Sequence, residues 1–468
     1  MPFDPWLGLS LATQVSAASH ADAAAHAALR AQRLAALLRS AVKHSRLFRR
    51  LLRGSREPEA TPLAALPITR KRELMENFDD WVADPRLRLR GLRAFIEDPA
   101  RIGQPFLANY TVWESSGSSG EPCIFVQDAG AMAVYDALEA LRRPRLRPLQ
   151  PWLDPFWLAE RMAFVGATNG HFASTVSIER LRGLNPVLAP RLRSLCFLQP
   201  MAQLVAQLNA LAPTILATYP SAAVLLAEER QAGRLRAPVR EVWTGGEALS
   251  GAMRRFVQEA FGCPASNSYG ASEFLSLASE CTQGHLHLNS DWVILESVDE
   301  SGRPVPDGEA GATTLLTNLA NHVQPLIRYD LGDRVHLLPQ ACSCGSRLPM
   351  LQVQGRSDDT LRLGGSGAAR RVSVLPLALC TVLESDAGLF DFQLVQEGPR
   401  ALLLRTGLKG ESADAALQCG RRALDAYLQR QGARGVQIRC RSAEASLVGR
   451  GGKVPRVVAS GTRPAAQR

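Results

Sequence analysis

The sequence predicts an α/β protein that consists of a large N-terminal part and a smaller C-terminal part. The first observation is length, because 468 residues correspond to roughly two to three domains. The second is an alternation of short β-like runs with helix-like stretches between about residues 105 and 355. The third is a charged, glycine-rich segment at 355–367, after which fresh strand patterns begin, such as 401–404.

Residue spacing predicts the individual elements. Residues 21–53 are expected to form a helix, because Leu34, Leu37, Leu38 and Ala41 recur at i, i+3, i+4 and i+7 with arginines on the other faces. Further along the chain, the pattern predicts strands at 123–126 and 311–317 and helices at 201–211, 221–232 and 253–261. This alternation is the reason for the α/β assignment.

The composition excludes several classes of protein. Apolar residues make up 46% and charged residues 21%, which is close to the globular average and excludes wholesale disorder. The longest apolar run, 374–383, contains Pro376 and is shorter than the ~20 residues of a membrane span. The nine cysteines are an odd number and mostly isolated, and Asp4 lies in an N-terminus without a basic start. We therefore expect a cytoplasmic protein with no signal peptide and no membrane span.

The positive net charge is not a specific sign of nucleic-acid binding. The formal charge is +10, but only four of the 54 basic residues are lysines, namely Lys43, Lys71, Lys409 and Lys453. The 50 arginines (54 minus 4) are spread along the whole chain. Such usage is typical of a compositional bias, so no nucleic-acid partner is expected, whereas a phosphorylated ligand or an acidic partner is compatible with the charge.

A serine- and glycine-rich loop is the strongest local signal. Residues 115–120 read Ser-Ser-Gly-Ser-Ser-Gly and precede the strand predicted at 123–126. Glycines allow a ligand to approach the backbone closely, and hydroxyls with free amides can hold phosphate oxygens. The loop is not a Walker A motif, which requires Gly-Lys-Ser/Thr at the start of a helix. A single run of this kind is more often a flexible hairpin loop.

Four further motifs follow this loop in a fixed order, at 243–248, 268–273, 328–333 and 355–359. Each alone could be an ordinary turn. In this order and spacing they resemble the adenylate-forming superfamily of acyl and aryl acid ligases, in the branch typified by phenylacetate-CoA ligase. The resemblance extends from the N-terminal helix through 67–70 to Lys453 near the C-terminus.

The resemblance implies a fold of two domains. The first is a large multi-sheet adenylating domain, expected at residues 1–357. The second is a small α+β lid domain, expected at residues 358–468, which rotates about Arg356 and Asp358 in the hinge. A polar connecting loop is the alternative for these two residues.

The resemblance also implies an ATP site. The loop residues would hold the β- and γ-phosphates, although Glu121 stands where the family usually has lysine. Tyr269 would stack on adenine, and the Asp333 carboxylate would accept both ribose hydroxyls. The whole set of expected ATP contacts is Ser115, Ser116, Gly117, Ser118, Ser119, Gly120, Gly245, Gly246, Glu247, Tyr269, Gly270, Ser272, Asp333 and Arg328. The alternatives are a core aromatic at Tyr269, a strand-ending turn at 245–247 and a surface salt bridge at Arg328.

Two residues would carry the chemistry of such a site. Glu273 matches the family's carboxylate for Mg²⁺, a cation that prefers oxygen ligands; a solvated acid at a helix start is the alternative. Lys453 matches the lysine that reaches the acyl carboxylate and the α-phosphate. A surface lysine is the usual alternative, but basic positions in this chain are almost always arginine, whose planar group differs from a compact ammonium in reach.

A separate set of cysteines and histidines predicts a metal centre. Cys281, His287, Cys342 and Cys344 could bind zinc tetrahedrally with no open position, and His285 is the substitute ligand. Some members of the branch that the chain resembles carry a structural zinc at matching positions. The alternative is a group of unrelated buried thiols beside a surface histidine.

The sequence therefore predicts an AMP-forming ligase that uses ATP and Mg²⁺. An aryl acid, with a hydroxybenzoate as the first guess, would form acyl-AMP and then pass to the thiol of CoA or of a phosphopantetheinyl acyl carrier protein. Arginines of the C-terminal part would suit either acceptor (Arg421, Arg422, Arg430, Arg434, Arg439 and Arg441). Adenylyl transfer to a non-thiol acceptor, and a non-catalytic binding protein on the same fold, are the alternatives.

Overall fold

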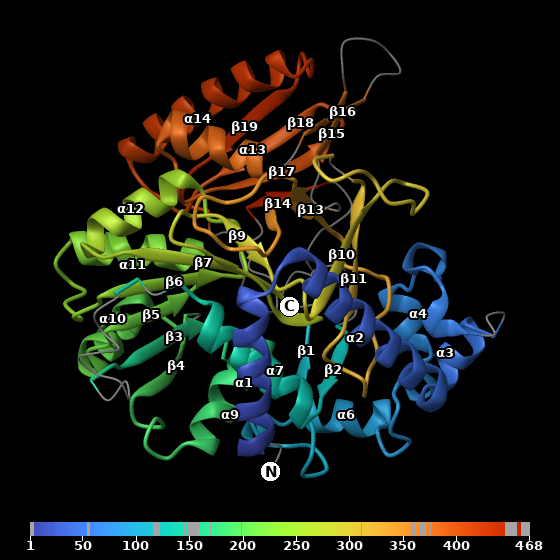
Figure 1. The fold of residues 1–468 in the computed structure, drawn as a ribbon. Coiled ribbons are helices and arrows are strands. Elements are labelled where there is room, and N and C mark those ends of the chain that lie inside the picture. Colours follow the sequence, from blue (N-terminus) through green and yellow to red (C-terminus); the bar gives the residue numbers. More distant parts are fainter. Residues whose placement is uncertain are drawn as a thin grey trace.

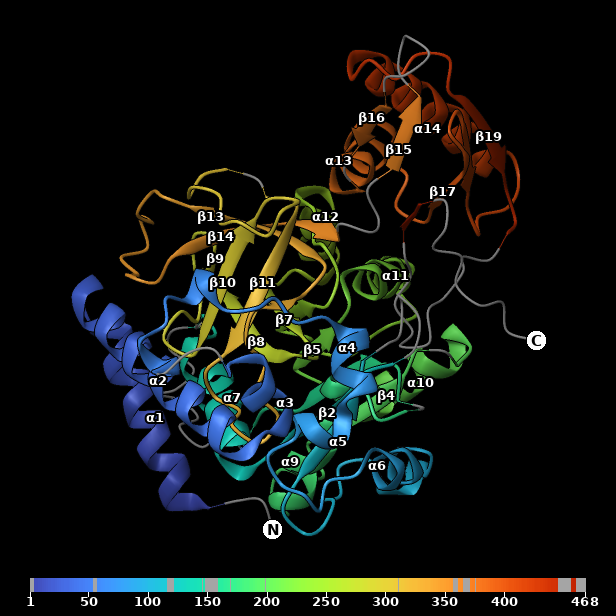
Figure 2. The same cartoon turned by 90° about the vertical axis from the view of Figure 1, so that its right-hand side faces the viewer.

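The computed structural model is a mixed α/β fold with a large multi-sheet part and a smaller C-terminal part (Figure 1 and Figure 2). None of the helices that it describes is long and apolar enough to cross a membrane. The structure describes residues 4–53, 57–115, 122–144, 146–147, 159–168, 170–197, 199–309, 311–356, 361–364, 371–374, 376–444 and 456–459.

The N-terminal region is helical, but the helix expected at 21–53 is two helices. The helical conformation is interrupted at Ser45. The buried hydroxyl of this residue accepts a hydrogen bond from the Phe48 amide (3.3 Å) and donates one to the Asp80 carbonyl (3.0 Å). A helix precedes this pair and is capped by Asp4. The helices of this region are α1 (Pro5–His20), α2 (Ala23–His44), α3 (Arg46–Leu51), α4 (Lys71–Glu76), α5 (Phe78–Trp81) and α6 (Leu89–Ile96), with short 3₁₀ turns at Pro58–Ala60, Leu63–Ala65 and Pro99–Arg101.

A nine-stranded sheet forms the centre of the large part. The four neighbouring pairs from β4 to β7 are parallel, and the pairs from β7 to β13 are antiparallel. The order across the sheet is β13 (Asp333–Leu338), β14 (Met350–Arg356), β9 (Leu286–Leu288), β8 (Phe274–Glu280), β7 (Ala265–Ala271), β6 (Glu241–Gly245), β5 (Ile215–Thr218), β3 (Met162–Gly166) and β4 (Leu192–Cys196).

Helices connect and cover the parallel half of this sheet. The helices predicted at 201–211, 221–232 and 253–261 correspond to α10 (Met201–Leu211), α11 (Pro220–Gln231) and α12 (Gly251–Phe261). Their apolar faces pack with side chains of β3, β5, β6 and β7 into one core cluster. The helices α7 (Ala129–Arg142) and α9 (Ala173–Leu184) complete the large part.

Two smaller sheets adjoin the large one. The hairpin of β1 (Thr111–Glu114) and β2 (Ile124–Gln127) is antiparallel, with Glu114 opposite Ile124, so the serine-glycine loop joins these two strands. The other sheet contains β10 (Val293–Val298), β11 (Thr313–Asn318) and β12 (Tyr329–Asp330). Both sheets share a second core cluster with the N-terminal helices and β8.

The C-terminal part has its own core. A four-stranded sheet packs against α14 (Glu411–Arg430), and a two-stranded ribbon of β15 (Leu361–Gly364) and β16 (Arg371–Val374) leads into it. The four-stranded order is β19 (Gln437–Arg441), β18 (Ala401–Arg405), β17 (Gln393–Gly398) and β20 (Val457–Val458). A π-helical turn, η4 (Val382–Asp386), contacts α12 of the large part, and helix α13 (Pro376–Thr381) contacts β14. The boundary expected between 357 and 358 stays a prediction, because residues 357–360 lie outside the described residues.

Candidate nucleotide site and metal centre

The carboxyl ends of β6 and β7 bring two of the predicted motifs together. These strands are parallel neighbours, and Gly245 lies opposite Ser268 in their register. A Cβ on Gly245 would come within 2.8 Å of the Ser268 hydroxyl oxygen, and Gly246 has a φ of +79°, so glycine suits both positions. In α/β sheets, ligands bind at the carboxyl ends of parallel strands. The motif of residues 245–247 therefore lies at the expected edge for a ligand.

Tyr269 and Asp333 meet at this edge. The Tyr269 hydroxyl donates a hydrogen bond of 2.6 Å to Asp333 Oδ2, although 64 positions separate the two residues in the chain. Tyr269 lies on β7, whereas Asp333 is the first residue of β13 and pairs with Arg356 of β14. The structure thus joins the predicted adenine-stacking ring and the predicted ribose carboxylate through a direct contact.

The rest of the 269–273 motif is fixed by close packing. A β-bulge lies between Tyr269 and Ala271, and a Cβ on Gly270 would be 2.0 Å from the Leu275 carbonyl oxygen. The Ser272 carbonyl accepts a hydrogen bond from Trp113 Nε1 (2.8 Å), and the Glu273 carbonyl accepts one from the Asn318 side-chain amide (3.0 Å). These contacts hold the motif against β1 and β11.

The base of the predicted phosphate loop lies in the same region. Ser115 follows β1, and its hydroxyl accepts a hydrogen bond from the Cys123 amide (2.9 Å), while the Ser115 amide donates to the Cys123 carbonyl (2.8 Å). Because Trp113 of the same strand contacts Ser272, the loop begins close to the 269–273 motif. Ser116, Gly117, Ser118, Ser119, Gly120 and Glu121 lie outside the described residues.

Lys71 lies near this site and was not among the expected residues. The Thr69 amide donates to the Arg328 carbonyl (3.0 Å), which fixes the start of α4, where Lys71 is the first residue. Burial raises the pKa of the Cys123 thiol well above its usual range; the Glu273 carboxylate raises it further, and the Lys71 ammonium lowers it. Both charges therefore act on the Cys123 thiol. The scarcity of lysine that singled out Lys453 could have singled out Lys71 as well.

Two of the predicted nucleotide residues have structural contacts. Glu247 Oε2 accepts a hydrogen bond from the Ser221 amide (3.0 Å) in the first turn of α11. Arg328 is buried, and its guanidinium pairs with Glu296 (3.1 Å). It also donates to the carbonyls of Ala64 (3.0 Å), Leu66 (2.8 Å) and Gly302 (3.2 Å). None of these printed partners belongs to the nucleotide motifs, and the nucleotide role expected for Arg328 stays a prediction.

Of the two predicted hinge residues and the predicted catalytic lysine, the structure describes only Arg356. Arg356 ends β14, where its backbone lies opposite Asp333. Asp358 and Lys453 lie outside the described residues. The roles expected for all three residues stay predictions.

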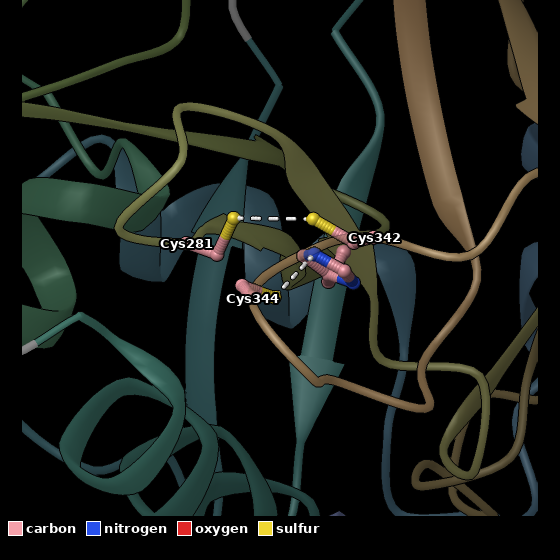
Figure 3. Close-up of side chains that lie close together, drawn as sticks. Cys281, Cys342 and Cys344 are labelled. Carbon is pink, nitrogen blue, oxygen red and sulfur yellow. Dashed lines mark hydrogen bonds between the residues drawn. The ribbon is translucent and has the colours of Figure 1, made fainter.

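The predicted metal ligands lie together (Figure 3). The candidate ligand atoms of Cys281, His287, Cys342 and Cys344 all lie within 4.8 Å of one another. The sulfurs of Cys281 and Cys342 are 3.8 Å apart, and Cys344 Sγ is 3.4 Å from His287 Nε2. A tetrahedral zinc with ordinary bond lengths would place two sulfurs about 3.8 Å apart and a sulfur and a nitrogen about 3.5 Å apart. The four residues therefore fit a zinc ion in number, type and spacing.

The surroundings of the cluster favour His287 over His285 as the fourth ligand. His287 Nδ1 contacts the Leu348 carbonyl (2.9 Å), which leaves Nε2 free to face the sulfurs. His285 Nδ1 lies 3.3 Å from Cys342 Sγ. Burial tends to raise the pKa of Cys342, but hydrogen bonds from the Cys344 backbone and from His285 lower it to about 6. A thiolate at neutral pH is the form that binds metal.

The chain is similar to known enzymes. Residues 181–315 match a family described as AMP-binding enzyme. A phenylacetate-coenzyme A ligase from Thermus thermophilus is 32% identical over 180 residues, which are 36% of this chain and 39% of that protein. A phenylacetate-coenzyme A ligase from Escherichia coli is 34% identical over 126 residues, which are 26% of this chain and 28% of that protein. The matches thus span less than two fifths of either relative.

A solved structure extends the similarity of fold over nearly the whole chain. A crystal structure of 2-hydroxyisobutyryl-CoA ligase, in its postadenylation state, superimposes with a TM-score of 0.65 at 21% sequence identity. The superposition covers 92% of this chain and 89% of that chain. This likeness confirms the predicted fold class, a large multi-sheet domain with a smaller C-terminal sheet domain.

Proposed function

Because this chain belongs to the adenylate-forming superfamily, in its phenylacetate-CoA ligase-like branch, we propose that it joins a carboxylic acid to CoA in two steps. In the first, a carboxylate oxygen attacks the α-phosphorus of ATP, forming acyl-AMP and releasing pyrophosphate. In the second, the sulfur of CoA attacks the acyl carbon and AMP leaves. The two steps together consume one ATP for each thioester.

The Tyr269–Asp333 contact is the observation that carries this proposal. Adenosine needs a flat surface for its base and an acceptor for its two ribose hydroxyls. The 2.6 Å hydrogen bond places a phenol ring and a carboxylate side by side at the carboxyl end of β7. In the bound state, the ribose hydroxyls would replace the Tyr269 hydroxyl as donors to Asp333. The pair is thus prepared for the nucleoside before it binds.

Positive charges around the negatively charged phosphates of ATP would stabilise the transition state of the first step. Mg²⁺ held by the Glu273 carboxylate would supply positive charge to the phosphate oxygens. Lys453 would neutralise charge that develops between the carboxylate and the α-phosphorus. Lys71, whose positive charge lowers the pKa of the Cys123 thiol, is proposed to supply positive charge to the phosphates as well. An ammonium on Lys71 would then compensate for the lysine that the loop lacks.

The acid is proposed to be an aryl acid. Both relatives named above act on phenylacetate by name, and this branch supports a ring-bearing substrate. A hydroxybenzoate is the first candidate, and phenylacetate is the second. CoA is the proposed acceptor, and an acyl carrier protein is tested beside it.

Zinc is proposed to have a structural role in this enzyme. The four candidate ligands leave no open coordination position, as in structural rather than catalytic zinc sites. The cluster joins the loop after β8 to the turn between β13 and β14. It would therefore stabilise the hairpin that carries Asp333.

Exchange of labelled pyrophosphate into ATP tests the function. Purified protein with Mg²⁺ is assayed against benzoates, hydroxybenzoates, phenylacetates and fatty acids, and thioester formation is then followed with CoA or a carrier protein. We expect exchange that depends on one aryl acid and that falls steeply in Lys453→Ala. Lys409→Ala, which changes an exposed lysine of the C-terminal part, is the matched control. No exchange with any acid in the panel would contradict aryl acid activation.

A further inference from the structure

Three buried carboxamide side chains connect two parts of the proposed nucleotide site, namely the hairpin of the serine-glycine loop and the backbone of Glu273. Asn318 ends β11, and Asn321 and Gln324 follow it in the chain. Each of the three residues is at most 1% exposed. Buried amide groups need hydrogen-bond partners within the protein, because burial removes their hydrogen bonds to water. We call these three residues the carboxamide network.

Two members of the network bind the backbone of β2, the strand that follows the serine-glycine loop. Gln324 Oε1 accepts a hydrogen bond from the Val126 amide (2.7 Å), and Gln324 Nε2 donates one to the Ile124 carbonyl (2.9 Å). Asn321 Nδ2 donates to the Val126 carbonyl (2.8 Å) and to Gln127 Oε1 (2.9 Å). Among the described residues, β1 is the only strand that pairs with β2. The two side chains therefore take the place of a second neighbouring strand.

Asn318 connects the network to the backbone of Glu273. Its Nδ2 donates a hydrogen bond to the Glu273 carbonyl (3.0 Å) and another to the hydroxyl of Tyr135 on α7 (3.0 Å). The Tyr135 hydroxyl in turn donates a longer hydrogen bond to Gln127 Oε1 (3.4 Å), the atom that also accepts from Asn321. A continuous chain of hydrogen bonds thus runs from the Glu273 backbone to β2.

The side-chain oxygens of the two asparagines fix the loop that carries them. Asn318 Oδ1 accepts from the Ala320 amide (2.9 Å) and the Asn321 amide (3.2 Å). Asn321 Oδ1 accepts from the Val323 amide (3.0 Å) and the Gln324 amide (3.2 Å). Each asparagine therefore holds its own loop through the oxygen and the neighbouring segments through the NH₂ group. A change to aspartate separates these two roles, because it keeps the first and removes the second.

We infer that Asn318 is a positioning residue for Glu273, and that the carboxamide network fixes Glu273 relative to the hairpin of the serine-glycine loop. This inference rests on the proposed function, because it needs Glu273 to act in the first step. A group held in this way reaches the reacting phosphates from a fixed backbone position. The proposed nucleoside contacts are made instead by Tyr269 and Asp333. Loss of the network should therefore slow the reaction more than it weakens nucleotide binding.

Two variants test the positioning role. Asn318→Asp keeps the oxygen that fixes the loop, but it removes both donors and turns a carboxylate oxygen towards the Glu273 carbonyl. We expect kcat for acid-dependent pyrophosphate exchange to fall by at least about tenfold, while Kd for a non-hydrolysable ATP analogue stays within about threefold of the wild type. Tyr135→Phe is the milder variant, and its kcat should fall by about three- to tenfold with the same unchanged Kd.

Tyr110→Phe is the matched control. It also removes a hydroxyl donor from a buried tyrosine of the large part, but that hydroxyl donates to Asp84 (2.6 Å). Its kcat and Kd should both stay within about twofold of the wild type. Thermal melting shows which variants are folded. An unchanged kcat in folded Tyr135→Phe, or equal losses of kcat and of analogue affinity, would overturn the inference.

Hydrogen–deuterium exchange tests the network without any catalytic activity. In Asn318→Asp we expect faster exchange in a peptide that covers 270–276, with unchanged exchange in α11 as an internal reference. Unchanged exchange at 270–276 would contradict the hold of Asn318 on the Glu273 backbone. Absence of pyrophosphate exchange in the wild type would instead defeat the proposed function, and deuterium exchange would still decide whether Asn318 fixes this segment.

Discussion

The hairpin of β13 and β14 carries two different sites, one at each end. At one end, Asp333 contacts Tyr269 through a single hydrogen bond. At the other end, the turn supplies Cys342 and Cys344 to the cluster with Cys281 and His287. The strand β13 spans about 17 Å between these ends, at about 3.3 Å per residue. The comparison sets a proposed metal site, which would stabilise the protein, against a proposed nucleotide site.

The two ends differ in how complete they are without a ligand. The metal cluster has its ligand atoms at the spacing of a zinc ion, so its geometry is already specified by packing. At the nucleotide edge, Tyr269 and Asp333 are in contact, and several other residues proposed for this site lie outside the described residues. We therefore expect changes at the cluster to reduce stability first, and changes at the edge to reduce nucleotide binding first.

The largest effect is expected for Cys344→Ser. Loss of a zinc ligand should lower the metal affinity by more than the ~10–100-fold that is typical for an outer partner of a metal ligand, and should lower the melting temperature. Metal content by mass spectrometry and thermal melting measure both. Cys440→Ser, whose thiol contacts the Leu417 carbonyl in the C-terminal part, is the control. Wild-type protein that purifies without zinc and melts the same with and without a chelator would contradict a structural metal.

The next effect separates the two ends of the hairpin. Asp333→Asn removes the charged acceptor and should lower kcat/KM for ATP by about 10–100-fold, as expected when a hydrogen bond to a charged group is lost. Its melting temperature without nucleotide should stay close to that of the wild type. Asp330→Asn is the matched control, since Asp330 accepts from the Thr313 hydroxyl (2.8 Å) instead. Equal losses of activity in both variants would show that kcat/KM for ATP depends on the structure of the hairpin and not on the Asp333 carboxylate.

A smaller loss is expected for Lys71→Met. The variant keeps much of the apolar stem and removes the ammonium, so KM for ATP should rise by about tenfold, with little change in melting temperature. Lys43→Met, near the end of α2, is the control. If KM for ATP is unchanged, Lys71 does not offset the charge of the phosphate loop.

The smallest effect is expected for Glu228, which lies on α11. Desolvation raises the pKa of Glu228, and the nearby Asp391 and Glu229 carboxylates raise it further. A raised carboxyl pKa destabilises the folded state above that pKa, and the penalty disappears once the pH falls below the unfolded pKa. Glu228→Gln should therefore melt slightly higher than the wild type at neutral pH and equally at about pH 4. A difference of the same size at both pH values would contradict this charge effect.

The sequence predicted those features whose signal is local or ordered along the chain. The helices α10, α11 and α12 follow from apolar spacing, and the four metal ligands follow from residue type and separation. Tyr269 and Asp333 were predicted for one site through motif order, and they are in contact. These patterns were strong because each constrains several residues at once.

Other features depend on partners that are distant in sequence. The guanidinium of Arg328 is buried against Glu296 and backbone carbonyls. Its position depends on the N-terminal segment, because Ala64 and Leu66 supply two of these carbonyls. The interruption of the helix at Ser45 depends on the Asp80 carbonyl, and the buried Glu384 carboxylate pairs with Arg456. No local pattern in the sequence identifies these pairs, because each member alone is an ordinary polar residue.

Calorimetric titration with a non-hydrolysable ATP analogue and Mg²⁺ tests the central claim most directly. The claim is that the Tyr269–Asp333 pair at the carboxyl end of β7 receives the nucleoside. We predict saturable binding to the wild type and to Asp330→Asn, and binding to Asp333→Asn that is weaker by about tenfold or more. Equal affinity in all three proteins, or no binding to the wild type, would contradict it.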